Sequence, residues 1–143
     1  MEPDDDPFLL TLEADRWGAG PDDPLVALQF RARQQGYRLR FPDGDDSLVV
    51  VDGEPAGRLL VALRPGAHHL VDIALLRRFR GRGIGTGLVG DVQAAAGAAG
   101  VPVELSVRSG DSALVEWYGR LGFEPTSSGA VHVRMIWSPS FAR

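Results

Sequence analysis

Short apolar runs alternate with longer segments of helical period along this chain, and together they predict a mixed α/β fold of the α+β type. Apolar runs bounded by glycine, proline or aspartate indicate strands, whereas apolar residues recurring every three or four positions indicate helices. We expect strands at 8–12, 47–51, 58–63, 69–76, 103–107, from 123 onward and at 131–137, with helices at 24–35, 83–99 and 111–122.

The first third of the chain contains one helical pattern followed by a polar segment. Leu25, Leu28 and Ala32 are spaced as on one face of a helix, which predicts that they face the core. Gly36 is expected to end this helix. Segment 37–46 mixes aromatic, basic and acidic residues, which favours a loop on the substrate side.

The later elements have a more regular pattern of apolar positions. One face of the helix over 83–99 is apolar, and the strands at 103–107 and 131–137 alternate apolar and polar residues. The residues expected to face the core are Ile84, Leu88, Val92 and Ala95 on the helix and Val103, Leu105, Val107, Val131, Val133 and Met135 on the strands.

Composition narrows the class of protein. A chain of 143 residues is expected to form one domain, 1–143, with the acidic tip 1–7 disordered. The absence of cysteine excludes disulfides, thiolate catalysis and cysteine-ligated zinc, and we expect no metal. The net charge of −4 argues against nucleic-acid binding. No run approaches the roughly 20 apolar residues of a membrane span, so we expect a cytoplasmic protein without membrane contact.

Segment 71–88 is the clearest candidate for chemistry. An apolar strand leads into a loop with alternate glycines, and an alanine-rich helix follows. Glycines let backbone amides approach an anion closely, and a helix start adds partial positive charge. The pattern therefore indicates a phosphate-binding loop, the alternative being a tight strand-to-helix turn with solvated arginines. The loop glycines are Gly81, Gly83, Gly85 and Gly87, and the arginines are Arg77, Arg78, Arg80 and Arg82.

Two familiar phosphate loops do not fit this segment. A Walker loop needs a lysine, which is absent here. The loop also lies past the midpoint of the chain, with too little sequence after it for the dinucleotide-binding domain of a Rossmann loop. Residues 80–85, Arg-Gly-Arg-Gly-Ile-Gly, instead resemble the Gln/Arg-x-x-Gly-x-Gly signature of the GNAT superfamily of acetyl-CoA-dependent N-acetyltransferases. A second family signature resembles 114–125, where Tyr118, Gly122 and Phe123 hold the matching positions. The resemblance covers 47–137 well and the first 46 residues only in outline.

This resemblance implies a GNAT-like fold, a central mixed and mostly antiparallel sheet with splayed central strands, flanked by helices. It also implies acetyl-CoA as co-substrate, with its pantetheine arm on the strand entering the loop and its pyrophosphate on the loop amides. One position departs from the family, because Asp111 replaces a common asparagine. An ionised carboxylate cannot donate a hydrogen bond, so we favour a helix cap there. By position, the implied cofactor-binding residues are Ile73, Ala74, Leu75, Arg80, Gly81, Arg82, Gly83, Ile84, Gly85, Thr86 and Asp111.

The resemblance also implies a catalytic acid. Tyr118 matches the family's acid by position, and a phenol of pKa about 10 can protonate a leaving thiolate of pKa about 8.5. The alternative is a core aromatic whose hydroxyl bonds to the backbone. A backbone N–H near Ala74 or Leu75 would polarise the thioester carbonyl.

Two candidates remain for the general base. Family members often carry a glutamate about eleven residues before the loop motif, and counting back from Arg80 reaches His69, with His68 beside it. Histidine titrates near neutral pH, but adjacent residues of a strand point to opposite faces. Asp72 is the second candidate. A carboxylate in an apolar strand needs a partner, and we favour a structural role, in a salt bridge or a turn-closing hydrogen bond, for instance to one of the arginines.

The acceptor is expected to be a primary amine on a small molecule or peptide. Acidic residues on the expected acceptor side could steer a cation, whereas arginines in the same region favour an anion, so the acceptor's charge stays open. The alternative function is a non-catalytic module of the same fold that binds or senses acyl-CoA. Trp137 and Phe141 would give a homodimer its apolar contacts. The acidic residues are Asp43, Asp45, Asp46 and Asp52, and the arginines are Arg33, Arg38 and Arg40.

Overall fold

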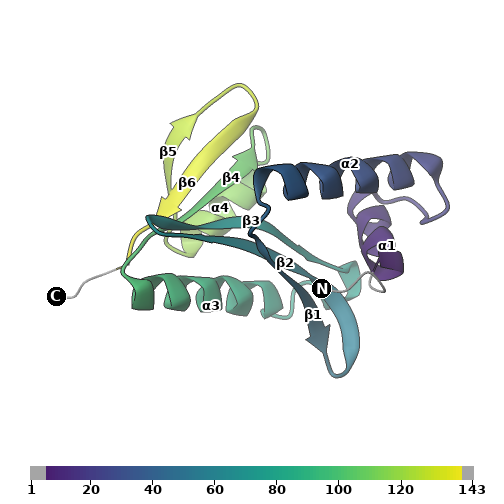
Figure 1. Ribbon diagram of the computed structural model, residues 1–143, viewed down its shortest axis with the longest axis horizontal. Helices are drawn as coiled ribbons and strands as arrows, with labels where there is room; N and C mark the ends of the chain where they lie inside the picture. The colour runs from purple at the N-terminus through teal and green to yellow at the C-terminus, as the bar shows by residue number, and fades with distance from the viewer. Residues whose placement is uncertain (1–5, 140–143) are drawn as a thin grey trace. The chain divides into compact units, whose positions relative to one another are not determined.

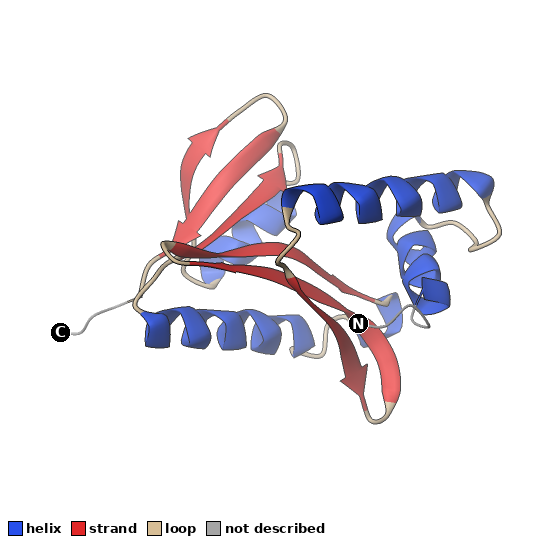
Figure 2. Cartoon of the chain, in the orientation of Figure 1, coloured by secondary structure: helices blue, strands red, loops and turns tan. Residues whose placement is uncertain are grey.

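The computed structural model describes residues 6–139 (Figure 1). Two helices come first and three consecutive strands follow; helices and strands then alternate up to the two strands at the end, as the colours of Figure 2 show. In chain order the elements are α1 (Asp6–Trp17), α2 (Pro24–Arg40), β1 (Asp45–Val51), β2 (Glu54–Arg64), β3 (Ala67–Leu75), the 3-10 helix η2 (Arg77–Phe79), α3 (Ile84–Ala99), β4 (Val103–Arg108), α4 (Ser112–Arg120), β5 (Glu124–Ser128) and β6 (His132–Trp137).

The strands form one mixed sheet in the order β1-β2-β3-β4-β6-β5. Antiparallel pairing joins β1 to β2, β4 to β6 and β5 to β6, whereas β3 and β4 are parallel. Their parallel ladder is short, since only His68 with Val103 and His69 with Glu104 are in register among the described residues. The predicted fold class is confirmed, and so short a central ladder is what splayed central strands require.

The chain divides into two compact units. Within the described range the first comprises 6–61 and 72–82, and the second comprises 62–71 and 83–139. Strands β2 and β3 contribute residues to both units. The predicted single domain over 1–143 stays a prediction. Within 6–139 no helix combines the length and apolarity needed to cross a membrane.

The first unit begins with α1, where the predicted strand at 8–12 is wrong. Leu9 and Leu12 are buried together with Glu13, and this spacing of three and four residues is helical. A short apolar run fits a strand or a buried helix equally well, which explains the error. The tip predicted to be disordered, 1–7, overlaps α1 at its last two residues, and 1–5 lie outside the described residues.

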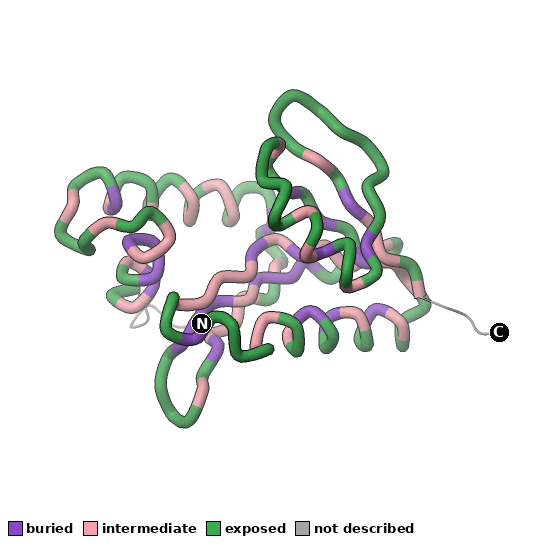
Figure 3. The backbone as a smooth tube through the Cα atoms, turned by 180° about the vertical axis from the view of Figure 1, so that it is seen from behind, coloured by how far each residue is buried: buried purple, intermediate pink, exposed green. Residues whose placement is uncertain are grey.

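Helix α2 is longer than predicted and buries a different face. Gly36 lies inside it, so the predicted helix end is wrong, and the predicted loop at 37–46 is reduced to 41–44. Interior glycine costs about 1 kcal/mol relative to alanine, which tertiary contacts can offset. The structure buries Val26, while Leu25 and Leu28 are 66% and 54% exposed. Most of α2 is accordingly drawn as exposed or intermediate in Figure 3.

The strands predicted at 47–51 and 58–63, with a turn expected over 52–57, correspond to β1 and β2, which form a hairpin with a tighter turn. Val51 pairs with Glu54, so the loop has two residues. Asp52 and Gly53 have φ of 51° and 80°, and two positive φ angles define the type I′ turn that Asp-Gly favours. The turn expected over 52–57 therefore occupies two positions, and β2 begins directly after it.

The ladders of both outer strands contain a register irregularity. In the β1–β2 ladder, Val49 pairs with Gly57 and Val50 with Pro55, so the extra residue is Ala56 of β2. In β5 the irregularity lies between Pro125 and Ser127, opposite β6, and every residue of β5 is exposed. Irregularities of this kind bend a strand and interrupt its ladder.

The second unit confirms the predicted alternation of β4 and shifts the face of α3. The sequence predicts that α3 buries Ile84, Leu88 and Ala95. In the structure Ile84 and Leu88 are half-buried, and Ala95 is exposed. Val92 is buried as predicted, and Val89 and Ala96, each next to a predicted position, complete the buried face. In β6, Met135 is buried as predicted, Val133 is half-buried, and Val131 lies before the strand and is exposed. The buried residues are Val89, Val92 and Ala96 in α3 and Val103, Leu105 and Val107 in β4.

Trp137 at the end of β6 packs within the second unit. A Cβ built on Gly122 would lie 3.1 Å from Trp137 Cδ1, and one on Gly97 would lie 3.8 Å from its Cη2. Strand β6 is paired on both sides, so its backbone is not a free edge. Phe141, the second predicted dimer contact, lies outside the described residues, and a homodimer stays a prediction.

Candidate functional site

The glycine loop predicted to bind phosphate follows β3 and opens into α3. Gly81 and Gly83 have φ of 75° and 80°, a left-handed conformation that residues with side chains rarely adopt. A Cβ built on either would find no heavy atom within 4 Å beyond its chain neighbours. The backbone conformation therefore requires glycine at both positions, and the space beside them is open to a ligand.

Helix α3 starts without a side-chain cap. Gly83 occupies the N-cap position, and its carbonyl accepts the first helical hydrogen bond from the Gly87 N–H at 3.0 Å. The amides of Ile84, Gly85 and Thr86 therefore have no acceptor within the helix. Aligned peptide dipoles add partial positive charge at the same point. Unpaired amides and positive potential at a helix start fit a phosphate group.

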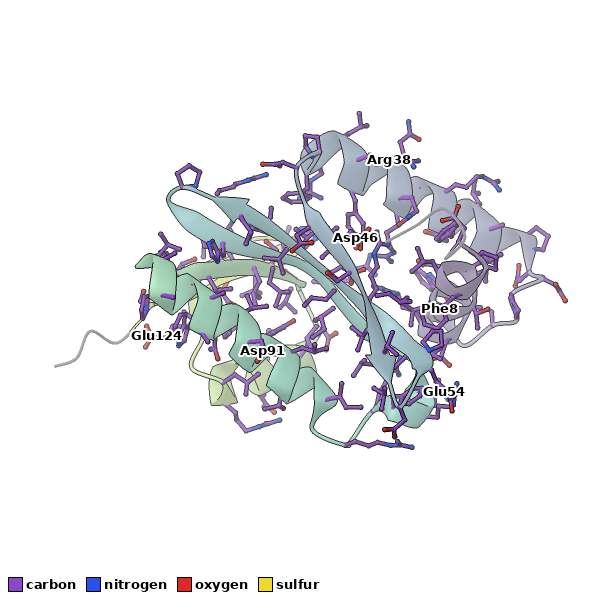
Figure 4. The ribbon with its side chains drawn as sticks, turned by 60° about the horizontal axis from the view of Figure 1, so that its bottom comes forward. Phe8, Arg38, Asp46, Glu54, Asp91 and Glu124 are labelled. Carbon is purple, nitrogen blue, oxygen red and sulfur yellow. The ribbon has the colours of Figure 1, made fainter. Side chains whose placement is uncertain are left out.

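The exposed arginines of the loop lie around one buried ring. Arg78 and Arg82 place their guanidinium groups over the Phe79 ring, at 4.6 and 5.3 Å from its centroid. Phe79 is buried and fixes the 3-10 turn beneath them. Arg78 also pairs with Glu54 at 2.8 Å (Figure 4 labels Glu54). In the sequence, Arg82 directly precedes Gly83, the N-cap of α3.

Arg80, the first residue of the loop motif, braces the loop. Its Nε donates a hydrogen bond to the Leu75 carbonyl at 2.9 Å, and its Nη2 donates to Asp15 Oδ2 at 3.3 Å. The same oxygen of Asp15 accepts from the backbone N–H of Arg77 at 2.9 Å. The side chain of Arg80 therefore joins the end of β3 to helix α1.

Gly57 was predicted to lie in a turn, and its role in strand packing was not predicted. A Cβ there would lie 2.1 Å from the Ala74 carbonyl oxygen and 2.8 Å from Leu75 Cδ2. The Leu76 N–H bonds to the Ala56 carbonyl at 2.8 Å, directly beside this contact. Strand β2 can approach the end of β3 this closely only with glycine. The sequence signal was an isolated glycine next to a strand pattern, which marks close backbone approach.

The two candidate bases on β3, His69 and Asp72, do not share a face. Residues of a strand alternate in direction, so His69 points with Ile73, whereas His68 and Asp72 point the other way. His68 Nδ1 is buried and has no hydrogen-bond partner among the described residues, and His69 is half-buried. Asp72 and His69 therefore cannot serve as one catalytic pair on a single face.

Asp72 forms the ion pair that the sequence favoured, with an arginine outside the loop. Arg16 Nη2 lies 3.2 Å from Oδ1 and 3.1 Å from Oδ2 of the carboxylate, which is only 7% exposed as a residue. Arg16 Nε is buried and has no partner among the described residues. The pair links α1 to β3, in which the three residues after Asp72 are the predicted pantetheine contacts.

A second polar cluster joins α1 and α2 inside the first unit. Glu13 accepts hydrogen bonds from Trp17 Nε1 at 2.6 Å and Arg33 Nε at 3.0 Å, and Arg33 donates to the Tyr37 hydroxyl at 3.3 Å. Burial raises the pKa of Tyr37, and the charge of Asp72 raises it further, while Arg33 and Arg16 lower it in part. Tyr37 is therefore a neutral phenol near Asp72. Sequence reasoning missed this cluster because α1 was assigned as a strand.

One of the acidic residues predicted on the acceptor side, Asp46, is paired with a buried arginine. Arg58, which is 4% exposed, binds Asp46 through two hydrogen bonds of 2.9 and 2.7 Å, bonds Gln34 and lies over the Tyr37 ring (Figure 4 labels Asp46). Among the predicted arginines, Arg33 is engaged in the cluster above. The other residues predicted on the acceptor side are exposed, namely Asp43, Asp45, Asp52, Arg38 and Arg40.

The second motif lies in α4 and the turn after it. Tyr118 is 5% exposed, and its ring lies 4.8 Å from Trp117 and 5.5 Å from Phe123 between centroids. Gly122 has φ of 99°, which explains why the motif carries glycine there. Asp111 caps α4, since its carboxylate accepts a hydrogen bond from the Leu114 N–H at 3.1 Å. The helix-cap interpretation of Asp111 is confirmed.

The chain belongs to the GNAT family of acetyltransferases. Its sequence matches the Acetyltransferase (GNAT) family over residues 8–123. No curated protein matches the chain by sequence. No group of three or more histidine, aspartate or glutamate side chains among residues 6–139 is arranged to hold a metal ion.

Solved structures share the fold at low sequence identity. PH1933 from Pyrococcus horikoshii OT3 is 15% identical with a TM-score of 0.78, covering 99% of this chain and 94% of that protein. The PaiA N-acetyltransferase of Thermoplasma acidophilum, solved in complex with coenzyme A, is 13% identical with a TM-score of 0.74, covering 96% and 95%. An acetyltransferase from Thermus thermophilus is 19% identical with a TM-score of 0.73, covering 96% and 93%.

Proposed function

We propose that this chain binds acetyl-CoA and transfers the acetyl group to a primary amine of a small molecule or peptide. The observation that carries the proposal is the uncapped start of α3 behind two left-handed glycines. Family membership supports acyl transfer as the activity, and the similar PaiA N-acetyltransferase was solved with coenzyme A.

The chain's own residues would hold the co-substrate in two ways. The amides of Ile84, Gly85 and Thr86 would donate to the pyrophosphate, and the charge of Arg82 would neutralise it. Residues 73–75 would present backbone groups to the pantetheine arm. Arg80 donates a hydrogen bond to the Leu75 carbonyl, so we propose that its side chain stabilises the conformation of the binding loop.

The chemistry requires a neutral amine. A lysine-like amine has a pKa of about 10.4, so deprotonating it at pH 7 costs roughly 4.6 kcal/mol. We assign His69 to take this proton, directly or through water, because Asp72 is already paired with Arg16. The Tyr118 hydroxyl would return a proton to the departing thiolate, and an amide near Ala74 or Leu75 would stabilise the carbonyl oxygen.

Replacing His69 tests the base with an internal control in the next residue. His69→Gln should lower kcat by about 100-fold, since general-base catalysis contributes about 10²- to 10⁴-fold. His68→Gln should change kcat by less than about threefold, because its side chain points to the opposite face. Equal effects of both substitutions on kcat, or no effect of either, would remove His69 from the proposed mechanism.

Ligand-induced stabilisation tests the proposed co-substrate. Saturation at 100 times the dissociation constant stabilises a folded protein by about 2.7 kcal/mol, so acetyl-CoA should raise the melting temperature by several degrees. ATP and NAD should leave it unchanged. If ATP or NAD gives the shift and acetyl-CoA gives none, the loop binds a nucleotide and the acetyltransferase proposal fails.

The second candidate is a module that binds acyl-CoA without transfer. The ion pair of Asp72 with Arg16 favours it, because this pair occupies one of the two predicted bases. Incubation with acetyl-CoA and a panel of amines, followed by measurement of free thiol, separates the two functions. Thiol release that depends on an amine supports transfer, whereas binding without release on any amine supports the module.

A further inference from the structure

We infer that Asp15 of α1 is a positioning residue that sets the conformation of the phosphate loop and restrains its positive charge. The inference rests on the proposed function, since it concerns the loop that would hold the coenzyme A diphosphate. Asp15 lies more than sixty residues before the loop in sequence and belongs to neither family motif.

The geometry places one carboxylate oxygen at both ends of the turn that enters the loop. Asp15 Oδ2 accepts from the Arg77 backbone N–H at 2.9 Å and from Arg80 Nη2 at 3.3 Å. Arg77 is the first residue of η2, and Leu76 at the N-cap provides no side-chain hydrogen bond. Asp15 therefore caps this 3-10 turn from a different helix.

The contact of Asp15 is reinforced from both sides. Arg80 also donates to the Leu75 carbonyl, so the carboxylate, the guanidinium and the strand end form one chain of hydrogen bonds. The neighbouring Arg16 binds Asp72 three residues before the strand end. Two consecutive residues of α1 thus hold segment 72–80 at two points, directly before the left-handed Gly81 and Gly83.

The exposure of the Asp15–Arg80 pair indicates that Asp15 affects the position and the charge of the loop more than the stability of the fold. The side chains of Asp15 and Arg80 are 26% and 48% exposed, and ion pairs so open to solvent contribute little to stability. Their effect on a bound diphosphate would be larger, because the carboxylate pairs with Arg80 and so offsets one positive charge of the loop. Asp15 therefore has two opposing effects on anion binding, a favourable one through loop geometry and an unfavourable one through charge.

Two substitutions of Asp15 separate these effects. Asp15→Asn keeps an oxygen that can accept from the Arg77 N–H but removes the negative charge. Asp15→Ala removes both. At low ionic strength, Asp15→Asn should tighten coenzyme A binding by about two- to fivefold, and this gain should disappear in high salt. Asp15→Ala should weaken binding by about three- to tenfold, because the turn loses its cap.

The measurement is isothermal titration calorimetry of the full chain with coenzyme A, at low and high salt, beside thermal unfolding of each variant. Asp22→Asn is the matched control, since it makes the same change in net charge at an exposed site in the loop between α1 and α2. Its dissociation constant should stay within about twofold of that of the unsubstituted chain, because Asp22, unlike Asp15, forms no hydrogen bond or ion pair with residues 77–80 of the described chain.

Opposite shifts for the two Asp15 variants support the inference. It is overturned if both variants change affinity in the same direction, if neither changes it while the melting temperature falls, or if Asp22→Asn tightens binding as much as Asp15→Asn. A chain that binds no coenzyme A in any variant would refute the proposed function itself. The two failures are therefore distinguishable.

Discussion

Replacing Tyr118 by phenylalanine should lower kcat by about 100-fold or more while the dissociation constant for acetyl-CoA changes by less than about threefold. The substitution removes one hydroxyl and keeps the ring that contacts Trp117 and Phe123. A thiolate that leaves without a proton donor is expelled more slowly, whereas the binding of the diphosphate does not involve this hydroxyl. Steady-state release of free thiol gives kcat, and calorimetry gives the affinity.

The control for this experiment is Trp117→Phe, which perturbs the same aromatic cluster without removing a phenol. It should cost stability and leave kcat within a few-fold of the unsubstituted chain. If Tyr118→Phe lowers kcat and acetyl-CoA affinity by equal factors, the residue acts through packing. Its 5% exposure would then be that of an ordinary core aromatic.

Replacing Gly83 by valine should abolish detectable coenzyme A binding in a chain that still folds. Gly83 has φ of 80°, and a β-branched residue in this conformation costs about 1–3 kcal/mol. The start of α3 must then change its backbone conformation, which moves the amides of Ile84 and Gly85 away from a bound phosphate. Because a Cβ there meets no neighbouring atom, the strain is confined to the loop and the remaining fold is kept.

Gly90→Val provides the matched comparison for Gly83→Val. Gly90 lies within α3, is exposed, and has open space for a side chain without a positive φ. Its substitution should leave coenzyme A affinity unchanged. Circular dichroism checks that both variants are folded, and calorimetry measures binding. Coenzyme A binding by a folded Gly83→Val chain with unchanged affinity would show that the start of α3 does not hold the diphosphate.

The sequence predicted the glycine loop correctly because its residues depend on local backbone conformation. Gly81 and Gly83 need positive φ, and Gly122 in the second motif needs it too, so the requirement is visible in the residue type itself. The alternation of β4 was equally readable, since a strand buried on one face and exposed on the other repeats every two residues.

The first 46 residues could not be predicted from local patterns. Five residues from Phe8 are compatible with a strand or a helix, and only tertiary contacts decide for α1 (Figure 4 labels Phe8). In α2 the most regular apolar spacing belongs to the exposed face with Leu25 and Leu28, whereas the packed face carries Arg33 and Tyr37 in polar contacts. Burial of polar groups follows from partners distant in sequence, which periodicity does not contain.

The same limit applies to the candidate site. Asp72 was recognisable as a carboxylate that needs a partner, but its partner Arg16 comes from a helix that the sequence did not indicate. Gly57 and Asp15 were missed because their roles are close approaches across 17 and 62 positions of sequence, counted from Gly57 to Ala74 and from Asp15 to Arg77.

The irregular ladder of β5 bears on how the protein behaves at high concentration. An edge strand with regular unpaired amides and carbonyls is a template for further chains, and this is a route to amyloid-like aggregation. Here the β5 edge carries Pro125, which has no N–H to donate, and an extra residue, Thr126, before Ser127. Addition of a further strand at this edge is therefore disfavoured.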